Sequence, residues 1–275
     1  SDKPVCQSAE SADALVKAES LSPNHKPSTR ESSLHRFQAS ATSFNLRAPN
    51  ITNVDQNYLK RSVAEATVEH IESRLTKDTI LGIGTGSTVN FLIEELIKIR
   101  HKFDCAVSSS TASTLLLENG GIKVIDLNAA PTLEIYIDGA DEANHSKQLI
   151  KGGGGALTRE KIVAQAADEF VCMIDETKLV NNLGGFPLPV EVIPLARGLV
   201  ARQLKQFSST PIWRQGFVTD NGNIILDIHD LKIADGEELE RKINDIPGVV
   251  SNGLFTLRTA DTLLVSGSKG ISVIN

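Results

Sequence analysis

The sequence is poor in cysteine and in the larger aromatic residues, with three Cys, one Trp and two Tyr among 275 residues. The cysteines Cys6, Cys105 and Cys172 are odd in number and far apart, which fits neither a disulfide framework nor a paired metal motif. We therefore expect a reducing compartment and a cytoplasmic location. Cys105 and Cys172 lie in apolar segments, so we interpret them as small buried hydrophobic residues rather than reactive thiols.

Positive charge and long apolar runs are also scarce. The formal net charge is −6, there is no long basic run, and few aromatic residues are available for base stacking, so we expect no nucleic-acid partner. A local cationic pocket remains compatible with this charge. No segment approaches the roughly 20 apolar residues of a membrane-spanning helix, so we expect no membrane partner either. The length suits one large or two modest domains.

Residues 1–55 differ in character from the rest of the chain. They are rich in Ser, Ala, Asn and Pro, and their few apolar residues follow neither a helical nor a strand period. We predict a disordered N-terminal extension. No apolar segment follows a basic start, as in a secretory signal, and acidic residues such as Asp2 and Glu10 count against an organelle transit peptide.

Helical and strand-like segments alternate from residue 57 onward. Helices are predicted from 57 to about 77 and at 89–100, 113–119 and 157–167, and strands at 79–83, 104–107, 123–127, 133–137 and 169–174. Such alternation favours an α/β fold with a Rossmann-like, mainly parallel sheet and helices on both faces.

The pattern changes after residue 187. Helices are predicted at 195–207 and 236–244, and strands at 190–193, at 211–214, as a pair around the turn Asp220-Asn221-Gly222, and at 249–254. This order resembles a small ferredoxin-like α+β unit. Final strands at 262–265 and 271–274 could return to the first sheet. The predicted domains are therefore an α/β catalytic domain of residues 56–187 plus 258–275, and a small α+β domain of residues 188–257.

Three polar loops follow predicted strands, where ligands of parallel sheets bind. The first, residues 82–88, reads Gly-Ile-Gly-Thr-Gly-Ser-Thr and precedes a helix. Backbone N–H groups and hydroxyls there suit a phosphate or a sugar oxygen; the alternative is a tight turn with helix-capping side chains. A dinucleotide fingerprint would need glycine where Ser87 stands, and a P-loop would need a terminal Gly-Lys-Ser/Thr.

The second loop is acidic and contains Asp138, Gly139, Ala140, Asp141 and Glu142. Three neighbouring carboxylates must be solvated, paired or used chemically. An acidic turn capping the next helix is one alternative. A divalent metal is another, although His145 is a weak candidate ligand, and we expect no metal.

The third loop, residues 151–161, reads Lys-Gly-Gly-Gly-Gly-Ala-Leu-Thr-Arg-Glu-Lys. Four consecutive glycines lose much conformational entropy on folding, so they indicate a backbone that passes very close to another group. A flexible linker is the alternative. It is disfavoured because Lys151 and a helix start carrying Glu160, rather than Ser-rich sequence, flank the glycines.

Together, and in this order, the three loops closely resemble the signature segments of the type A ribose-5-phosphate isomerase family. The resemblance continues through residues 175–178, 186–194, 216–222 and 246–250 and covers roughly residues 57–275. It implies a catalytic set in which Glu160 is the general base, Lys151 is the cation beside the reacting oxygens, and Asp138 and Asp141 are sugar-binding carboxylates. The substrate-binding residues that it implies are Thr85, Gly86, Ser87, Thr88, Gly139, Ala140, Gly152, Gly153, Gly154 and Lys178.

The implied reaction interconverts ribose 5-phosphate and ribulose 5-phosphate. Moving a proton between C1 and C2 needs one base and stabilisation of an enediolate, but no cofactor. Asp138 could assist opening of the sugar ring. The expected partner is a sugar phosphate, and the resemblance implies a homodimer or a dimer of dimers. Two other hypotheses remain at this stage: a nucleotide- or CoA-binding transferase of similar architecture, and a non-catalytic sugar-phosphate-binding regulator, which would have no need of Glu160.

Overall fold

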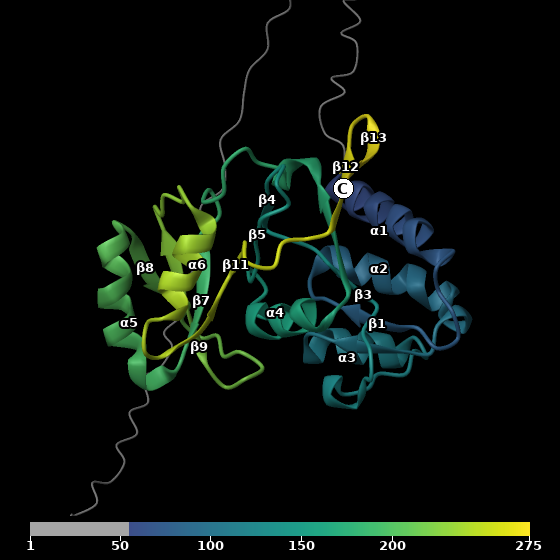
Figure 1. The fold of residues 1–275 in the computed structure, drawn as a ribbon, viewed down its shortest axis with the longest axis horizontal. Helices are drawn as coiled ribbons and strands as arrows, with labels where there is room; N and C mark the ends of the chain where they lie inside the picture. Colours follow the sequence, from purple (N-terminus) through teal and green to yellow (C-terminus); the bar gives the residue numbers. More distant parts are fainter. Residues whose placement is uncertain (1–54) are drawn as a thin grey trace, which may run out of the picture. The chain divides into compact units, whose positions relative to one another are not determined.

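The computed structural model describes residues 55–275. The predictions made for residues 1–54, including Cys6, lie outside these residues. Figure 1 shows the fold of these residues. A six-stranded sheet has the order β13-β12-β6-β3-β1-β2. Its strands are β1 (Ile80–Ile83), β2 (Cys105–Ser108), β3 (Ile135–Asp138), β6 (Glu169–Asp175), β12 (Thr262–Gly267) and β13 (Gly270–Ile274). All neighbours pair in parallel except β13, which lies antiparallel to β12. The predicted return of the last two strands to the first sheet is thereby confirmed.

Helices cover both faces of this sheet. Successive residues of a strand point to opposite faces, and in these strands both sets of side chains are apolar and have to be buried. On one face, Leu81, Ile137 and Val171 join a core shared with α1 (Gln56–Glu72), α2 (Ser87–Lys98) and α3 (Thr111–Asn119). On the other, Tyr136 and Phe170 pack with Val163 of α4 (Leu157–Ala166). The fold class predicted from the alternation of strands and helices is therefore confirmed. Asp138 follows Tyr136 by two residues, so it shares the face that α4 covers.

A second sheet is antiparallel and has the order β10-β7-β9-β8. Its strands are β7 (Leu188–Val192), β8 (Thr210–Trp213), β9 (Ile224–His229) and β10 (Val249–Asn252), with helices α5 (Arg197–Leu204) and α6 (Gly236–Asn244) in the connections. Val190, Val200, Leu226 and Ile243 meet in its core. The succession βαββαβ and this strand order are those of a ferredoxin-like unit, as predicted.

Two predictions of local structure differ from the observed fold, and one small sheet was not predicted. The strand expected at residues 123–127 is reduced to an isolated bridge between Ala106 and Val124. The expected strand pair around Asp220 is also wrong, because β9 pairs with β8 and the segment before the turn forms no strand. A three-stranded sheet of β4 (Glu142–Ala143), β5 (Leu149–Ile150) and β11 (Leu254–Phe255) was not predicted, since two-residue strands show no period.

Residues 55–275 form one compact unit, so the division into two domains stays a prediction. In this part of the chain no helix is both long and apolar enough to cross a membrane.

Candidate active site

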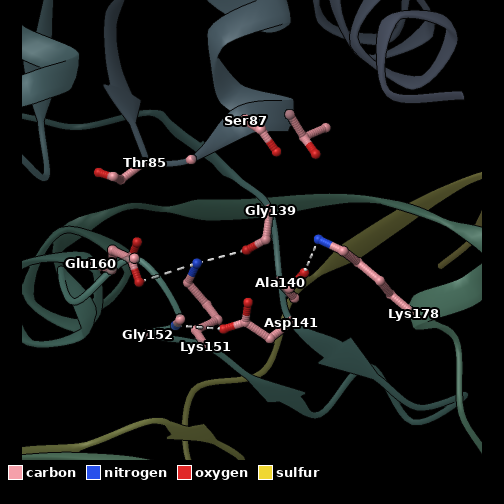
Figure 2. Close-up of a pocket in the computed structure, with 13 residues that line it drawn as sticks. Thr85, Ser87, Gly139, Ala140, Asp141, Lys151, Gly152, Glu160 and Lys178 are labelled. Atoms are coloured by element: carbon pink, nitrogen blue, oxygen red, sulfur yellow. Dashed lines mark hydrogen bonds and ion pairs between the residues drawn. The ribbon is translucent and has the colours of Figure 1, made fainter. Parts of the chain in front are cut away.

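A pocket of about 240 Å³ lies at the carboxyl ends of β1 and β3. Thirteen of the fourteen site residues predicted from the sequence line it. They are Thr85, Gly86, Ser87, Thr88, Gly139, Ala140, Asp141, Lys151, Gly152, Gly153, Gly154, Glu160 and Lys178 (Figure 2). The fourteenth, Asp138, is fully buried and contacts the pocket through Lys151. The fold thus gathers residues of the three polar loops, together with Lys178 from the segment after β6, in one place.

The loop after β1 passes so close to Asp138 that glycine is required in it. A Cβ on Gly84 would lie 1.9 Å from the Asp138 Cγ. Gly86 has a φ of 121°, a conformation that favours glycine, and it forms the N-cap of α2. Ser87 and Thr88 begin that helix and line the pocket, so the N–H groups of its first turn and two hydroxyls form a site suited to an anion.

Lys151 is the centre of the site. Its Nζ lies 2.7 Å from Asp138 Oδ2. Figure 2 shows its other two contacts: Nζ lies 3.2 Å from Glu160 Oε2 and donates a hydrogen bond of 2.6 Å to the Gly139 carbonyl. Lys151 and Glu160 are only 2% and 3% exposed. Burying ionised groups is unfavourable unless each one is paired, so a buried cluster of this kind contributes little to stability by itself.

Asp138 is saturated with donors. Its Oδ1 accepts from the N–H groups of Thr85 and Gly139, and its Oδ2 accepts from the Tyr136 hydroxyl in addition to the Lys151 ion pair. By contrast, Glu160 Oε2 accepts no hydrogen bond from any group in residues 55–275, although it is buried. The two carboxylates beside Lys151 therefore differ, one fully engaged and one available.

Burial and neighbouring charge shift the proton affinities of this cluster. Burial raises the pKa of Glu160 to about 8, against the attraction of Lys151 and with added repulsion from Asp138. Burial alone would lower the pKa of Lys151, but Asp138 and Glu160 raise it above its ordinary value. One ammonium between two carboxylates leaves an excess negative charge, which protonation of Glu160 removes.

The three carboxylates of the acidic loop, Asp138, Asp141 and Glu142, have different partners. Besides the paired Asp138, the Asp141 carboxylate lines the pocket and accepts a hydrogen bond of 2.8 Å from the Gly153 N–H. Glu142 is buried and accepts from the N–H groups of Gly184 and Phe186, which is a structural role. The alternative of an acidic turn capping the next helix is wrong, because the short strand β4 follows instead.

Lys178 lies across the pocket from Glu160 and donates a hydrogen bond of 2.7 Å to the Ala140 carbonyl (Figure 2). Within the described part of the chain, no three His, Cys, Asp or Glu side chains are grouped as metal ligands would be.

The backbone of the glycine run after Lys151 passes very close to neighbouring side chains, as predicted from its composition. A Cβ on Gly153 would lie 2.6 Å from Asp141 Oδ1, and one on Gly155 would lie 2.1 Å from the Phe217 ring. Gly152 and Gly155 also have positive φ values of 104° and 83°. The run is therefore a shaped loop with fixed neighbours, and the interpretation as a flexible linker is wrong.

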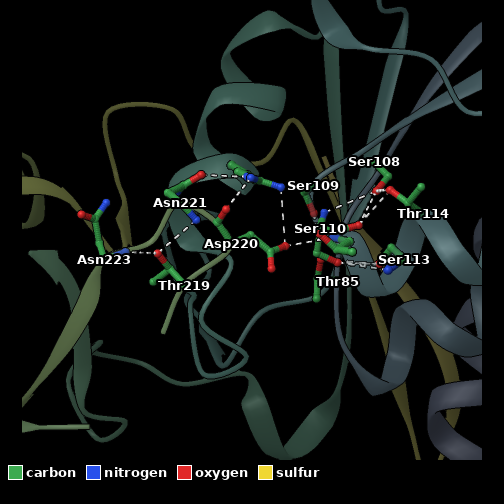
Figure 3. Close-up of polar contacts among 12 residues, drawn as sticks. Thr85, Ser108, Ser109, Ser110, Ser113, Thr114, Thr219, Asp220, Asn221 and Asn223 are labelled. Carbon is green, nitrogen blue, oxygen red and sulfur yellow. Dashed lines mark hydrogen bonds and ion pairs between the residues drawn. The ribbon is translucent and has the colours of Figure 1, made fainter. Parts of the chain in front are cut away.

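A second polar network joins the loop between β8 and β9 to the first residues of α3 and α4 (Figure 3). The Asp220 carboxylate accepts from the Thr111 N–H at the start of α3, and Arg159 donates to the Asn221 side chain and the Asp220 carbonyl. The buried Glu191 accepts from Thr158 and from the side chains of Thr219, Asn221 and Asn223. Since Arg159 precedes Glu160, this network also fixes the start of α4.

Sequence reasoning missed three residues that contact the site. Tyr136 donates to Asp138, and its position two residues earlier on the same strand was a usable signal. Lys60 of α1 donates a hydrogen bond of 3.0 Å to the Ser87 hydroxyl, and Arg214 donates to the carbonyls of Gly152 and Gly153. No local pattern marks these two residues, because the contacts join segments far apart in sequence.

The two cysteines behave as expected from their apolar surroundings. Cys105 and Cys172 are free and buried. Burial raises the pKa of the Cys105 thiol to about 11 and that of the Cys172 thiol to about 12, so neither forms a thiolate near neutral pH.

Comparison with known proteins identifies the family. Residues 105–270 match the family described as ribose 5-phosphate isomerase A (phosphoriboisomerase A). The solved structure of ribose 5-phosphate isomerase A from Neisseria gonorrhoeae is 47% identical, with a TM-score of 0.77, and the match covers 80% of this chain and 97% of that one. The structure of ribose 5-phosphate isomerase A from Methanocaldococcus jannaschii is 39% identical, with a TM-score of 0.74, over 80% and 100% of the two chains.

A third structure, of a D-ribose-5-phosphate isomerase in complex with phospho-erythronic acid, is 33% identical, with a TM-score of 0.76, over 81% and 100% of the two chains. Fold and site therefore place the protein among the aldose–ketose isomerases. Within that class, the chain belongs to the ribose 5-phosphate isomerase A family.

The raised pKa of Glu160 predicts how folding stability depends on pH. The folded state binds the Glu160 proton more tightly than the unfolded chain does, so this contribution is present below about pH 4.5 and is lost as pH rises to about 8. Glu160→Gln cannot titrate. We therefore expect the free energy of unfolding of Glu160→Gln, compared with that of wild type, to increase between pH 5 and pH 8 by up to about 1.4 kcal/mol per pH unit. Urea unfolding of both proteins checks this; a difference independent of pH would contradict it.

Proposed function

We propose that this chain interconverts D-ribose 5-phosphate and D-ribulose 5-phosphate through an enediolate, with Glu160 as the base. The observation that carries the residue assignment is the buried Glu160 carboxylate, which lies 3.2 Å from the Lys151 ammonium in a pocket with an anion-suited helix start. The reaction belongs to the non-oxidative pentose phosphate pathway, as family membership implies.

Glu160 would carry a proton between adjacent carbons on one face of the sugar. Removing it from C2 of the aldose gives an enediolate. After the hydroxyl proton has passed from O2 to O1, returning the first proton to C1 gives the ketose, so a single base serves both carbon centres. A carboxylate with a pKa of about 8 is a stronger base than an ordinary glutamate, which suits removal of a weakly acidic C–H proton. No hydride or electron leaves the substrate, so the reaction needs no redox partner.

The negative charge of the enediolate would fall on its two oxygens, beside the Lys151 ammonium. Since Asp138 is buried and all its acceptor positions are engaged, we assign it to orienting Lys151 and maintaining its charge. Asp141 lines the pocket and is the better placed of the two for contacts with sugar hydroxyls. Direct contact of Asp138 with the sugar, and its help in ring opening, stay predictions.

The phosphate would bind at the opposite side of the pocket from Glu160. Ser87 at the start of α2 and the ammonium of Lys178 lie there (Figure 2), and Thr88, the next residue of that helix, also lines the pocket. Lys60, which donates to Ser87, adds a second positive charge. The phospho-erythronic acid bound by the related enzyme carries a phosphate and a carboxyl group, which fits a site with one anion-binding side and one reacting side.

The residue assignment predicts the kinetics of Glu160→Gln in a coupled assay with ribose 5-phosphate. We expect kcat to fall by roughly 10²- to 10⁴-fold, with KM changed little, because the base acts in the transition state. We expect the wild-type rate to be unaffected by EDTA, and Lys151→Ala to lower the rate and the affinity together.

A matched control is Glu169→Gln, which removes a carboxylate paired with Arg74 outside the pocket and should keep wild-type kinetics. Unchanged turnover in Glu160→Gln would remove Glu160 from the mechanism. No turnover by the wild type would contradict the proposed function and revive the transferase and regulator hypotheses.

We further propose a cytoplasmic homodimer or dimer of dimers. The buried, free thiols of Cys105 and Cys172 support a reducing compartment. Large apolar side chains exposed near α5 and β8 support self-association, among them Leu195, which is 96% exposed, and Ile212 and Trp213. Sedimentation equilibrium should give two or four times the chain mass, and a monomer at micromolar concentration would contradict this proposal.

A further inference from the structure

The glycine loop is held from two opposite sides. On one side, the Gly153 N–H donates a hydrogen bond of 2.8 Å to Asp141, a residue that lines the pocket. On the other, Nη1 of Arg214 donates to the carbonyls of Gly152 and Gly153, at 3.2 and 3.0 Å. Arg214 directly follows β8 and lies about sixty residues further along the chain. It does not line the pocket.

These contacts determine where the loop's N–H groups point. In a trans peptide the carbonyl and the N–H point in opposite directions. The peptide joining Gly152 to Gly153 shows the consequence directly, with its carbonyl on Arg214 and its N–H on the pocket residue Asp141. The next peptide also has its carbonyl on Arg214, so the Gly154 N–H points to the pocket side. Gly154 lines the pocket, and its N–H has no hydrogen-bond acceptor within residues 55–275.

Arg214 is itself firmly held. Its Nε and Nη2 donate to the two carboxylate oxygens of Asp227 on β9, at 2.8 and 2.5 Å. Its guanidinium lies 5.5 Å from the centre of the Phe217 ring, which packs against Gly155. A bidentate, stacked arginine has one geometry and cannot be replaced by a point charge. The side chain therefore acts as a rigid support for the loop.

We propose that Arg214 is a positioning residue for the isomerisation: by holding the carbonyls of Gly152 and Gly153, it aims the Gly154 N–H at the enediolate oxygen. The Gly154 N–H would then stabilise the enediolate oxygen together with the Lys151 ammonium. Arg214 orients this N–H before the substrate binds, as effective oxyanion stabilisation requires. This inference rests on the proposed function, since it concerns the enediolate of that reaction.

The first test is Arg214→Met in the full chain. Loss of one oxyanion donor typically lowers kcat by about 10²- to 10³-fold, and a misdirected donor should have a smaller effect, roughly 10- to 100-fold. We expect KM and the affinity for inorganic phosphate to stay within about twofold of wild type, because the phosphate side of the pocket is untouched. The affinity for phospho-erythronic acid should fall together with kcat, because its carboxylate would lie at the reacting side.

Arg197→Met is the matched control. It removes another arginine of the same antiparallel unit, one that stacks 4.2 Å from the centre of the Trp213 ring and does not contact the glycine loop. Its kinetics should equal those of wild type. Should Arg214→Met fold poorly in thermal melts, Asp227→Asn loosens the same guanidinium more gently and should lower kcat in the same sense by a smaller factor.

The second test asks whether Arg214 acts through the Gly154 N–H. Gly154→Pro removes this N–H, whereas Gly154→Ala keeps it and places a methyl group where nothing lies within 4 Å. We expect the proline variant to lose much more activity than the alanine variant. Adding Arg214→Met to Gly154→Pro should lower kcat by no more than about twofold further, because both changes disable the same donor.

Losses that multiply in the double variant, or an Arg214→Met enzyme with raised KM and unchanged kcat, would overturn the inference. Either result, obtained with an active wild type, would leave the proposed isomerisation intact. An inactive wild type would instead contradict the proposed function itself.

Discussion

The site depends on one buried ammonium that is shared by two carboxylates. Lys151 lies between Asp138 and Glu160, and all three side chains are almost completely removed from water. Burial raises the pKa of Glu160 to about 8, because desolvation outweighs the attraction of Lys151, and Asp138 adds repulsion. Asp138 is surrounded by donors, whereas Glu160 Oε2 has no hydrogen-bond partner within residues 55–275. Burial and neighbouring charge therefore make Glu160 a stronger base than an ordinary glutamate.

The rest of the fold can be understood as support for this cluster. Asp138 ends β3 on the face that α4 covers, and α4 carries Glu160, so the strand and the helix bring the two carboxylates to one point. Tyr136 and the N–H groups of two loops hold Asp138 in place. On the remaining side, the antiparallel unit contacts the glycine loop through Arg214 and the start of α4 through Arg159 and its partners.

The sequence predicted the site better than it predicted the connections around it. The loops after β1 and β3 could be found because each follows an apolar strand, and parallel strands end at a common edge. The third loop follows β5 of the small antiparallel sheet, and its run of glycines marked it instead. Gly84 and Gly153 were informative for a physical reason, since a side chain at either position would overlap Asp138 or Asp141. The strand expected at residues 123–127 failed because a period of two also suits an extended segment with a single bridge. The roles of Arg214 and Lys60 depend on contacts between distant segments, which no local pattern records.

The central claim is that burial beside a shared lysine makes Glu160 a strong base, and a direct titration of its carboxyl group tests this. Difference infrared spectra of wild type against Glu160→Gln, recorded from pH 4 to pH 10, isolate the carboxyl and carboxylate bands of this one residue. The account predicts a midpoint near pH 8. A midpoint at the ordinary glutamate value of about 4.3 would contradict it, because Glu160 would then be an unperturbed carboxylate and the shared-lysine arrangement would have no effect on its basicity.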